Sequence, residues 1–100
     1  MIFFNVPKAK KQLVEKGLVY TLRSSFRAVG RTRAVEGSYS KHTTLCMVDV
    51  SRTKTVGYPS DLYPYLHYSG FKDVNIWWSK ATPTARTLYK VERVDQATVD

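Results

Sequence analysis

The stretch of sequence that decides the fold runs from residue 17 to residue 37 and reads GLVYTLRSSFRAVGRTRAVEG. From residue 18 to residue 28 it is typical of a strand, in which successive side chains point to opposite faces. The apolar face then carries Leu18, Tyr20, Leu22, Phe26 and Ala28, and the polar face carries Thr21, Arg23, Ser25 and Arg27. One face is therefore predicted to pack on a core, while the other offers guanidinium groups.

Two more arginines, Arg31 and Arg33, continue the odd-numbered series beyond Gly30. A glycine within a strand often marks a bend or a bulge, which resets the register of the side chains. The basic stretch therefore divides into two expected parts. Residues 17–23 are expected to form a strand that places a threonine and an arginine at a pocket. Residues 27–33 are expected to form a rim that binds a polyanion without recognising its sequence.

The segments before this strand are predicted to be a short strand over residues 2–6 and a helix. Asn5 can cap the helix, Pro7 is tolerated in its first turn, and Gly17 can end it. The helix is expected to turn Ala9, Leu13 and Val14 toward the core and Lys8, Lys11, Gln12 and Glu15 toward solvent.

After the arginine stretch, residues 43–50 form a nearly continuous apolar run. Such a run is typical of a strand that is covered on both faces or that closes a small barrel. Residues 51–54 are predicted to be a turn or a bulge, and residues 55–58 a short extension of the strand.

The last part of the chain is predicted to contain two short helices and a closing strand. Ser60 can cap a helical turn that runs to residue 66. Asp73 can cap a second helix. Its apolar residues recur at helical spacing, and they are Val74, Trp77, Trp78 and Ala81. Residues 87–94 alternate as a strand, and residues 96–100 are a polar tail.

This order of elements predicts a single β-rich α+β domain over residues 1–95. A small, mostly antiparallel β-barrel is expected, with short helices packed at its side and end, because closure removes exposed sheet edges. A chain of 100 residues with 43% apolar residues is long enough and apolar enough to form one packed core.

The charge of the chain is unevenly distributed. The net charge is +8, and residues 1–54 contain eleven Lys and Arg against three Asp and Glu, while residues 55–100 contain five of each sign. Such an excess favours a polyanionic partner. Nucleic acid is favoured over an anionic membrane, because the sequence has neither a lipidation signal nor a basic amphipathic helix of useful length.

The small numbers of cysteine and histidine residues disfavour disulfide-bonded and metal-binding proteins. Cys46 is the only cysteine, so a packed thiol in a cytoplasmic protein is expected. His42 and His67 are isolated from Cys46 and from each other, so neither a metal site nor a cofactor is predicted. No apolar run approaches the roughly 18–20 residues that span a bilayer, so no association with a membrane is expected.

The ordered set of these features resembles an ASCH domain of the PUA-like superfamily. The resemblance is carried by Lys16-Gly17, Tyr20-Thr21-Leu22-Arg23, the basic β segment, Ser69-Gly70-Phe71, the Trp77-Trp78 helix and the last strand Leu88-Tyr89-Lys90-Val91-Glu92-Arg93-Val94. It covers nearly the whole chain. It implies a PUA-like β-barrel with a cleft between barrel and helices, in a class associated with binding RNA or modified nucleobases.

The cleft motif of the family contains a glycine, a lysine, a threonine or glutamate, and an arginine. Gly17, Thr21 and Arg23 can be matched to this motif, but the spacing from Gly17 to Arg23 is one residue shorter than in the family. Leu18 or Val19 occupies the lysine position. Some ASCH proteins are amidohydrolases that act on acylated cytidine with a lysine, a threonine and a glutamate. Of that set only Thr21 has a match, and Ser69 stands near the place of the glutamate.

The candidate binding residues are cations that can bond to phosphate and aromatic residues that can stack on a base. The expected nucleic-acid-binding residues are Thr21, Arg23, Arg27, Arg31, Arg33, Lys41 and Arg52, and the expected stacking residues are Tyr68, Trp77 and Trp78. One tryptophan is expected in the core and the other partly exposed at the cleft. Any one arginine can instead be a solvated strand residue or a partner of Glu36 or Asp49.

The favoured function is a small module that binds RNA or single-stranded DNA. One alternative is an amidohydrolase that acts on an acylated or otherwise modified cytidine nucleoside. Another is a protein-interaction module with a basic docking face. No catalytic residue is assigned, and binding is favoured over catalysis because Thr21 and the serines have no obvious neighbouring base in the sequence.

Overall fold

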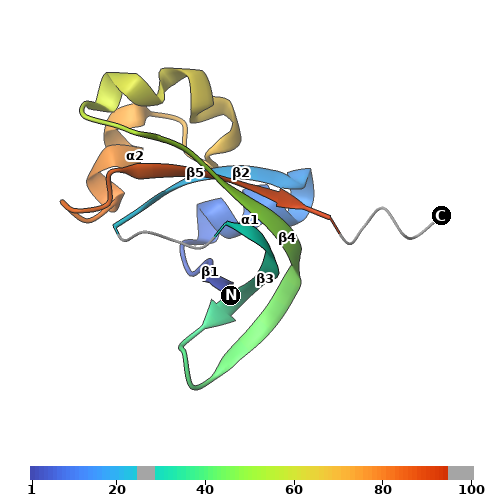
Figure 1. Ribbon diagram of the computed structural model, residues 1–100. Coiled ribbons are helices and arrows are strands. Elements are labelled where there is room, and N and C mark those ends of the chain that lie inside the picture. Colours follow the sequence, from blue (N-terminus) through green and yellow to red (C-terminus); the bar gives the residue numbers. More distant parts are fainter. Residues whose placement is uncertain (25–28, 95–100) are drawn as a thin grey trace.

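The computed structural model describes residues 1–24 and 29–94 (Figure 1). Within these residues the chain forms strands, two α-helices and a 3-10 helix, η1. In chain order the elements are β1 (Ile2–Phe3), α1 (Pro7–Lys16), β2 (Leu18–Arg23), β3 (Gly30–Gly37), β4 (His42–Thr55), η1 (Pro59–Tyr68), α2 (Val74–Lys80) and β5 (Thr87–Arg93).

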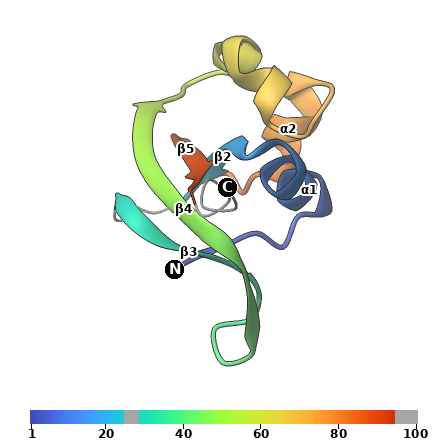
Figure 2. The same ribbon diagram turned by 90° about the vertical axis from the view of Figure 1, so that its right-hand side faces the viewer.

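The described strands form one curled sheet in the order β1-β3-β4-β5-β2. Neighbouring strands are antiparallel except for β1 and β3, which are parallel. The strand β4 arcs from the helices at one end of the molecule to the β3–β4 turn at the other, so the sheet forms a half-barrel (Figures 1 and 2). The predicted β-rich α+β class and the mostly antiparallel pairing are confirmed.

The expected barrel is present in part, because the described strands form a half-barrel. β1 and β2 are the two edges of the sheet, and in the described part of the chain they do not pair with each other. β1 contains only two residues before the chain turns into α1, so it cannot run alongside the six residues of β2. The half-barrel therefore has an open mouth between its two edge strands.

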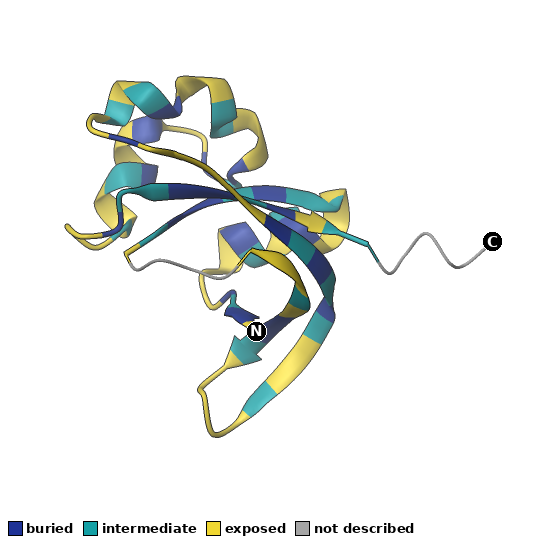
Figure 3. Cartoon of the chain, in the orientation of Figure 1, coloured by how far each residue is buried: buried dark blue, intermediate teal, exposed yellow. Residues whose placement is uncertain are grey.

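Two hydrophobic clusters cover the two faces of the sheet. The first joins β1 and α1 to the concave face and includes Ile2, Phe4, Leu13, Val19, Val48 and Tyr89. The second joins η1 and α2 to the opposite face and includes Leu22, Leu62, Phe71, Trp77 and Leu88. β2 and β5 contribute to both clusters, and most of their residues are buried or half-buried (Figure 3).

The strand at the start of the basic stretch is more buried than expected. β2 ends at Arg23, and the predicted continuation over residues 25–28 lies outside the described residues. Val19 and Thr21 are buried like Leu22, although the alternation predicted an exposed polar face. The cause is tertiary, because β1 and α1 pack against one face of β2 while η1 and α2 pack against the other.

Helix α1 begins and ends where its sequence signals predicted. Gly17 has a φ of 80°, and its N–H donates to the carbonyl of Leu13 at 2.9 Å, which is a left-handed helix stop. The predicted cap is wrong, since the N-cap is Val6 and not Asn5. The Asn5 amide instead donates to the carbonyl of Gly37 at 2.8 Å and accepts from its N–H at 2.7 Å. Asn5 thereby ties the segment after β1 to the end of β3.

Strands β3 and β4 form one long hairpin. β3 starts at Gly30, where φ is 113°. β4 continues through residues 51–54, and a register shift between Arg52 and Lys54 confirms the predicted bulge. A bulge bends and twists its strand, which is consistent with the curl of β4 toward the helices.

The two helices after β4 are capped by carboxylates. The predicted cap Ser60 is wrong, since η1 has Tyr58 as its N-cap and the Asp61 carboxylate accepts from the N–H groups of the two residues before the helix. The predicted cap of α2 is confirmed, because the Asp73 carboxylate accepts from the N–H of Asn75 at 2.6 Å. The predicted last strand is β5, which ends at residue 93.

Candidate functional site

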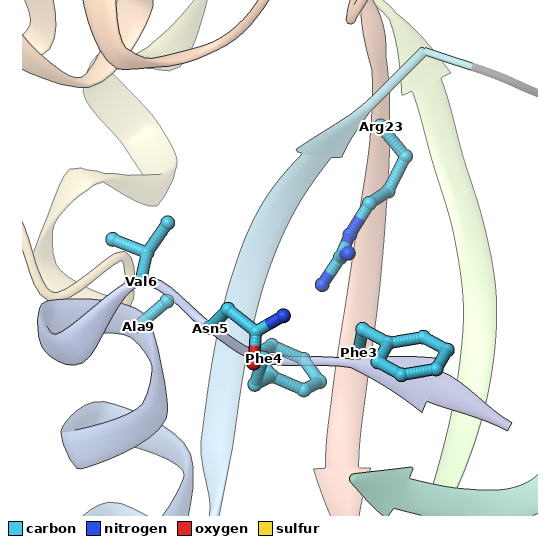
Figure 4. Close-up of a pocket in the computed structure, with 6 residues that line it drawn as sticks. All are labelled: Phe3, Phe4, Asn5, Val6, Ala9 and Arg23. Carbon is cyan, nitrogen blue, oxygen red and sulfur yellow. The ribbon is translucent and has the colours of Figure 1, made fainter. Parts of the chain in front are cut away.

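A hollow lies at the open mouth of the half-barrel, between the β1 segment and the end of β2 (Figure 4). Its volume is about 190 Å³. It is lined by Phe3, Phe4, Asn5, Val6, Ala9 and Arg23. The guanidinium carbon of Arg23 lies 4.9 Å from the centroid of the Phe4 ring, which is a cation–π contact. One wall of the hollow is therefore a half-buried, planar cation that rests on an aromatic ring.

A second hollow of about 70 Å³ shares two of its lining residues with the first. Thr21 lines it from β2, and Trp77 and Lys80 line it from α2. We call the two adjoining hollows the β2 cleft. Each hollow contains one cation, since Arg23 lines the first and Lys80 the second. Arg23 and a tryptophan therefore border the same cleft but line different parts of it.

Ser69, which also lines the second hollow, has a structural role. Its side chain is buried, and its Oγ donates to the carbonyl of Leu66 at 2.8 Å and accepts from the N–H of Phe71 at 2.9 Å. These bonds hold the turn between η1 and α2. The Ser69 hydroxyl is therefore engaged with the backbone on its own side of the cleft.

Three of the predicted binding residues lie on the concave face of the sheet. Thr21 of β2 pairs with Tyr89 of β5, and Tyr89 pairs with Arg52 of β4. Directly opposed residues in antiparallel strands point to the same face, so Thr21, Tyr89 and Arg52 form a row across the sheet. Arg23 is two residues beyond Thr21 and shares its face. The fold therefore brings Thr21, Arg23 and Arg52 together, and Arg52 is exposed.

Arg31 and Arg33 lie on the convex face of β3. Ala34 belongs to the concave-side cluster, and its neighbours in the alternating strand point the other way. The Nε of Arg31 donates to the Asp49 carboxylate at 2.9 Å, and this hydrogen bond lowers the pKa of Asp49. Arg23 and the β3 arginines therefore point to opposite faces, which is consistent with the expected division of the basic stretch into two parts.

The two remaining predicted cations are Lys41 and Arg27, and Lys41 lines none of the described hollows. Lys41 is exposed in the turn that joins β3 and β4, at the end of the hairpin remote from η1 and α2 (Figure 2). Arg27 lies outside the described residues. The predicted polyanion-binding rim over residues 27–33 therefore stays a prediction.

The predicted stacking residues differ in their exposure. Trp77 is 3% exposed, lines the cleft and lies nearly parallel to the Phe71 ring, with an interplanar angle of 9°. Trp78 is half-buried, and the guanidinium of Arg86 lies 3.7 Å from its ring centroid. Tyr68 is exposed at the end of η1. One tryptophan is in the core as predicted, but this buried residue, rather than its partly exposed neighbour, borders the cleft.

Among the residues of the cleft that sequence reasoning missed are Phe4, Asn5 and Lys80. In the sequence, Phe4 looks like an ordinary core residue of a strand, and Asn5 looks like a helix cap. Lys80 looks like a solvent-exposed lysine at the end of a helix. The adjacent pair Phe3-Phe4 is a partial signal, because neighbouring strand residues point to opposite faces and only one can enter a one-sided core. No local pattern reveals that Phe4 meets Arg23, since 18 intervening residues separate them.

The described residues also bear on metal binding, membrane crossing and the state of the one cysteine. In residues 1–24 and 29–94, no three His, Cys, Asp or Glu side chains are grouped as metal ligands. Among the helices that the structure describes, none has the length and apolar composition to cross a membrane. The Cys46 thiol is buried in β4, as predicted for a packed cysteine.

The comparisons with known proteins found no match. No protein-family model matches the chain, and neither the curated proteins nor the solved structures contain a match to it.

Proposed function

We propose that this protein is a PUA-like module of the ASCH type that binds single-stranded nucleic acid, RNA or DNA, in the β2 cleft. The observation that carries the proposal is the Arg23 guanidinium, held over the Phe4 ring on the concave face that also carries Arg52. The net charge of +8 and the ordered resemblance to the ASCH domain support the same function.

The size and chemistry of the first hollow suit one planar group. Its volume of about 190 Å³ is below the roughly 300–1,000 Å³ of ordinary small-molecule pockets. A guanidinium can make bidentate hydrogen bonds to phosphate and can stack on a base. Bases of a single strand are free to turn out of the stack, whereas those of a duplex are paired. The cleft therefore suits one unpaired base with its phosphate beside Arg23.

The first test compares two arginine substitutions of equal charge in a fluorescence titration with labelled single-stranded RNA and DNA. Arg23→Gln is expected to weaken binding about tenfold, because it removes the cation of the cleft. Arg31→Gln is the matched control, because Arg31 lies on the convex face and bonds to Asp49. It is expected to change the affinity by less than about twofold.

The same titration at several salt concentrations tests the electrostatic part of the proposal. The logarithm of the association constant is expected to fall with the logarithm of salt concentration, with a slope of about −0.7 for each phosphate contacted on a single strand. Absence of binding at low salt, or binding that salt does not weaken, contradicts the proposal. Equal losses from the two arginine variants contradict the role of the cleft.

The amidohydrolase alternative has one observation in its favour, since Thr21 and Lys80 line the same hollow. The reaction of the family also uses a glutamate, and the described residues that line this hollow include no carboxylate. Ser69, near the expected place of that glutamate, bonds to the backbone. A panel of acylated cytidines is therefore expected to give no turnover. Turnover that Thr21→Ala abolishes would favour the hydrolase instead.

A further inference from the structure

Helix α1 and η1 enclose a second groove, on the outer side of α1. Two hollows of about 420 and 560 Å³ share Gln12 and Gly70 and so adjoin each other. We call them the α1–η1 groove. The outward face of α1, which the sequence marks as solvated, forms one side of it, and Tyr63 and His67 of η1 lie on the other.

The groove is rich in lysine. Lys8, Lys11 and Lys16 line it from α1, and Lys72 lines it from the segment before α2, whereas Glu15 is the one carboxylate among its described lining residues. Salt bridges in the described part of the chain involve other lysines, so none of these four is neutralised by a carboxylate there. The groove therefore has a local excess of positive charge.

Aromatic rings lie beside these cations. Tyr63 is 63% exposed and lines the groove together with His67 and Phe71. Lysines that neutralise phosphates next to exposed rings that can stack on bases are the combination by which proteins hold single strands without sequence preference. An acidic peptide would use the lysines but would leave Tyr63 without a matching planar group.

The groove and the β2 cleft share one lining residue, Phe71. Phe71 lines the second hollow of the cleft and also the groove, and the Nζ of Lys8 lies 5.5 Å from the centroid of its ring. A strand that leaves the cleft past Phe71 reaches Lys8 first and then the other lysines. The two surfaces can therefore bind one continuous polyanion.

We infer that the α1–η1 groove is a second binding surface, which holds the sugar–phosphate chain of the same single strand whose base occupies the β2 cleft. The inference rests on the proposed function, because it assigns the groove to the same ligand. The cleft holds one nucleotide, and the groove extends the binding site to several more through phosphate contacts and stacking.

The test uses two oligothymidylates of about 4 and about 16 nucleotides, which span the site sizes of single-strand-binding domains. The double variant Lys11→Gln/Lys72→Gln removes two groove cations and keeps Lys8, whose side chain packs on Phe71. The control Lys54→Gln/Lys90→Gln removes the same charge from β4 and β5, outside the groove. Arg23→Gln serves as the cleft variant.

The groove variant is expected to bind the long oligonucleotide about tenfold more weakly and to make its salt slope shallower by about 1.4, or 0.7 for each lost contact. Its affinity for the short oligonucleotide is expected to stay within about twofold of the wild type, because a strand of about four nucleotides with one base in the cleft extends only a short way into the groove. Arg23→Gln is expected to weaken both.

Three outcomes overturn the inference. If the groove variant binds the long oligonucleotide as tightly as the wild type does, the groove is not used, while the proposed function stands. Equal losses from the groove variant and the Lys54/Lys90 control show a general charge effect. Tighter binding of polyglutamate than of the long oligonucleotide, with dependence on Lys11 and Lys72, assigns the groove to an acidic protein. If the wild type binds neither oligonucleotide, the proposed function itself fails.

Discussion

Gly70 lies where two segments that are distant in the sequence pack closely together. Its φ is 86°, and a Cβ at this position would overlap the backbone carbonyl of Lys8. The contact presses the turn between η1 and α2 against α1. It thereby positions Phe71, which lines both the β2 cleft and the α1–η1 groove. Only glycine fits there, for reasons of conformation and of space.

Gly70→Ala is expected to lower the free energy of unfolding by roughly 2–4 kcal/mol, because it adds left-handed strain to a steric overlap. Urea unfolding followed by tryptophan fluorescence measures the change. Gly57→Ala is the control, since a Cβ at Gly57 meets only an Asp61 oxygen at 3.9 Å. It is expected to change the free energy by less than about 0.5 kcal/mol. Equal effects of the two substitutions would contradict this account of Gly70.

At the scale of elements, η1 depends on a carboxylate at its start. Asp61 accepts from the N–H groups of Gly57 and Tyr58, at 3.0 and 3.1 Å. These backbone hydrogen bonds favour the charged carboxylate and lower the pKa of Asp61. They also fix the path of the chain between β4 and η1, the helix that carries the exposed tyrosines Tyr63 and Tyr68.

The pKa of Asp61 makes part of the stability depend on pH. Because its pKa in the folded protein is below the value of about 3.9 in the unfolded chain, the charged group contributes stability above that pH. The contribution is lost as the pH falls through the folded-state pKa. Asp61→Asn is therefore expected to lose less stability than the wild type between pH values of about 5 and 2. Urea unfolding at several pH values measures this loss, and identical losses would contradict the role of Asp61.

At the scale of the whole molecule, the order of strands determines which side chains are shielded from solvent. β5 lies between β4 and β2, and its residues Leu88, Tyr89 and Val91 are fully buried. Cys46 lies in the neighbouring strand β4 within the concave-side cluster and is 4% exposed. Its thiol can therefore react with a reagent only when the sheet opens.

Native protein is expected to react with a thiol reagent no faster than it unfolds, because Cys46 belongs to the main core. The labelling rate is measured against urea concentration and compared with unfolding followed by fluorescence. Ser51→Cys is the control, since Ser51 is exposed on the same strand and its thiol should react at once. Rapid labelling of Cys46 in the wild type would show that β4 opens separately from the rest of the sheet.

Much of the local structure could be predicted, because its causes are local. Pro7 and Gly17 mark the ends of α1 through a fixed φ angle and a left-handed stop, and Asp73 marks the start of α2 with its carboxylate. The bulge in β4 also has a local signal. The predicted cap Asn5 failed because its side chain bonds to Gly37 at the end of β3. The predicted cap Ser60 failed because η1 starts at Pro59, one residue earlier, with Tyr58 as its N-cap.

The candidate site could be predicted only in part. Thr21, Arg23 and Arg52 were expected at a binding surface, and they share the concave face. The residues that complete the cleft come from the segment after β1 and from α2, and nothing near Arg23 in the sequence points to them. A contact between residues far apart in the chain depends on how the sheet curls, which no short pattern encodes.

The sequence by itself determined the composition of elements, the end of α1, the start of α2 and the excess of positive charge, because these follow from backbone dihedral angles, capping and residue counts. The tertiary structure decided which arginines share a face, since strand order and register separate Arg23 from Arg31. It also decided that the barrel stays open between β1 and β2. The physical reason is that side-chain direction alternates locally, whereas the face that becomes a cleft is set by long-range pairing and packing.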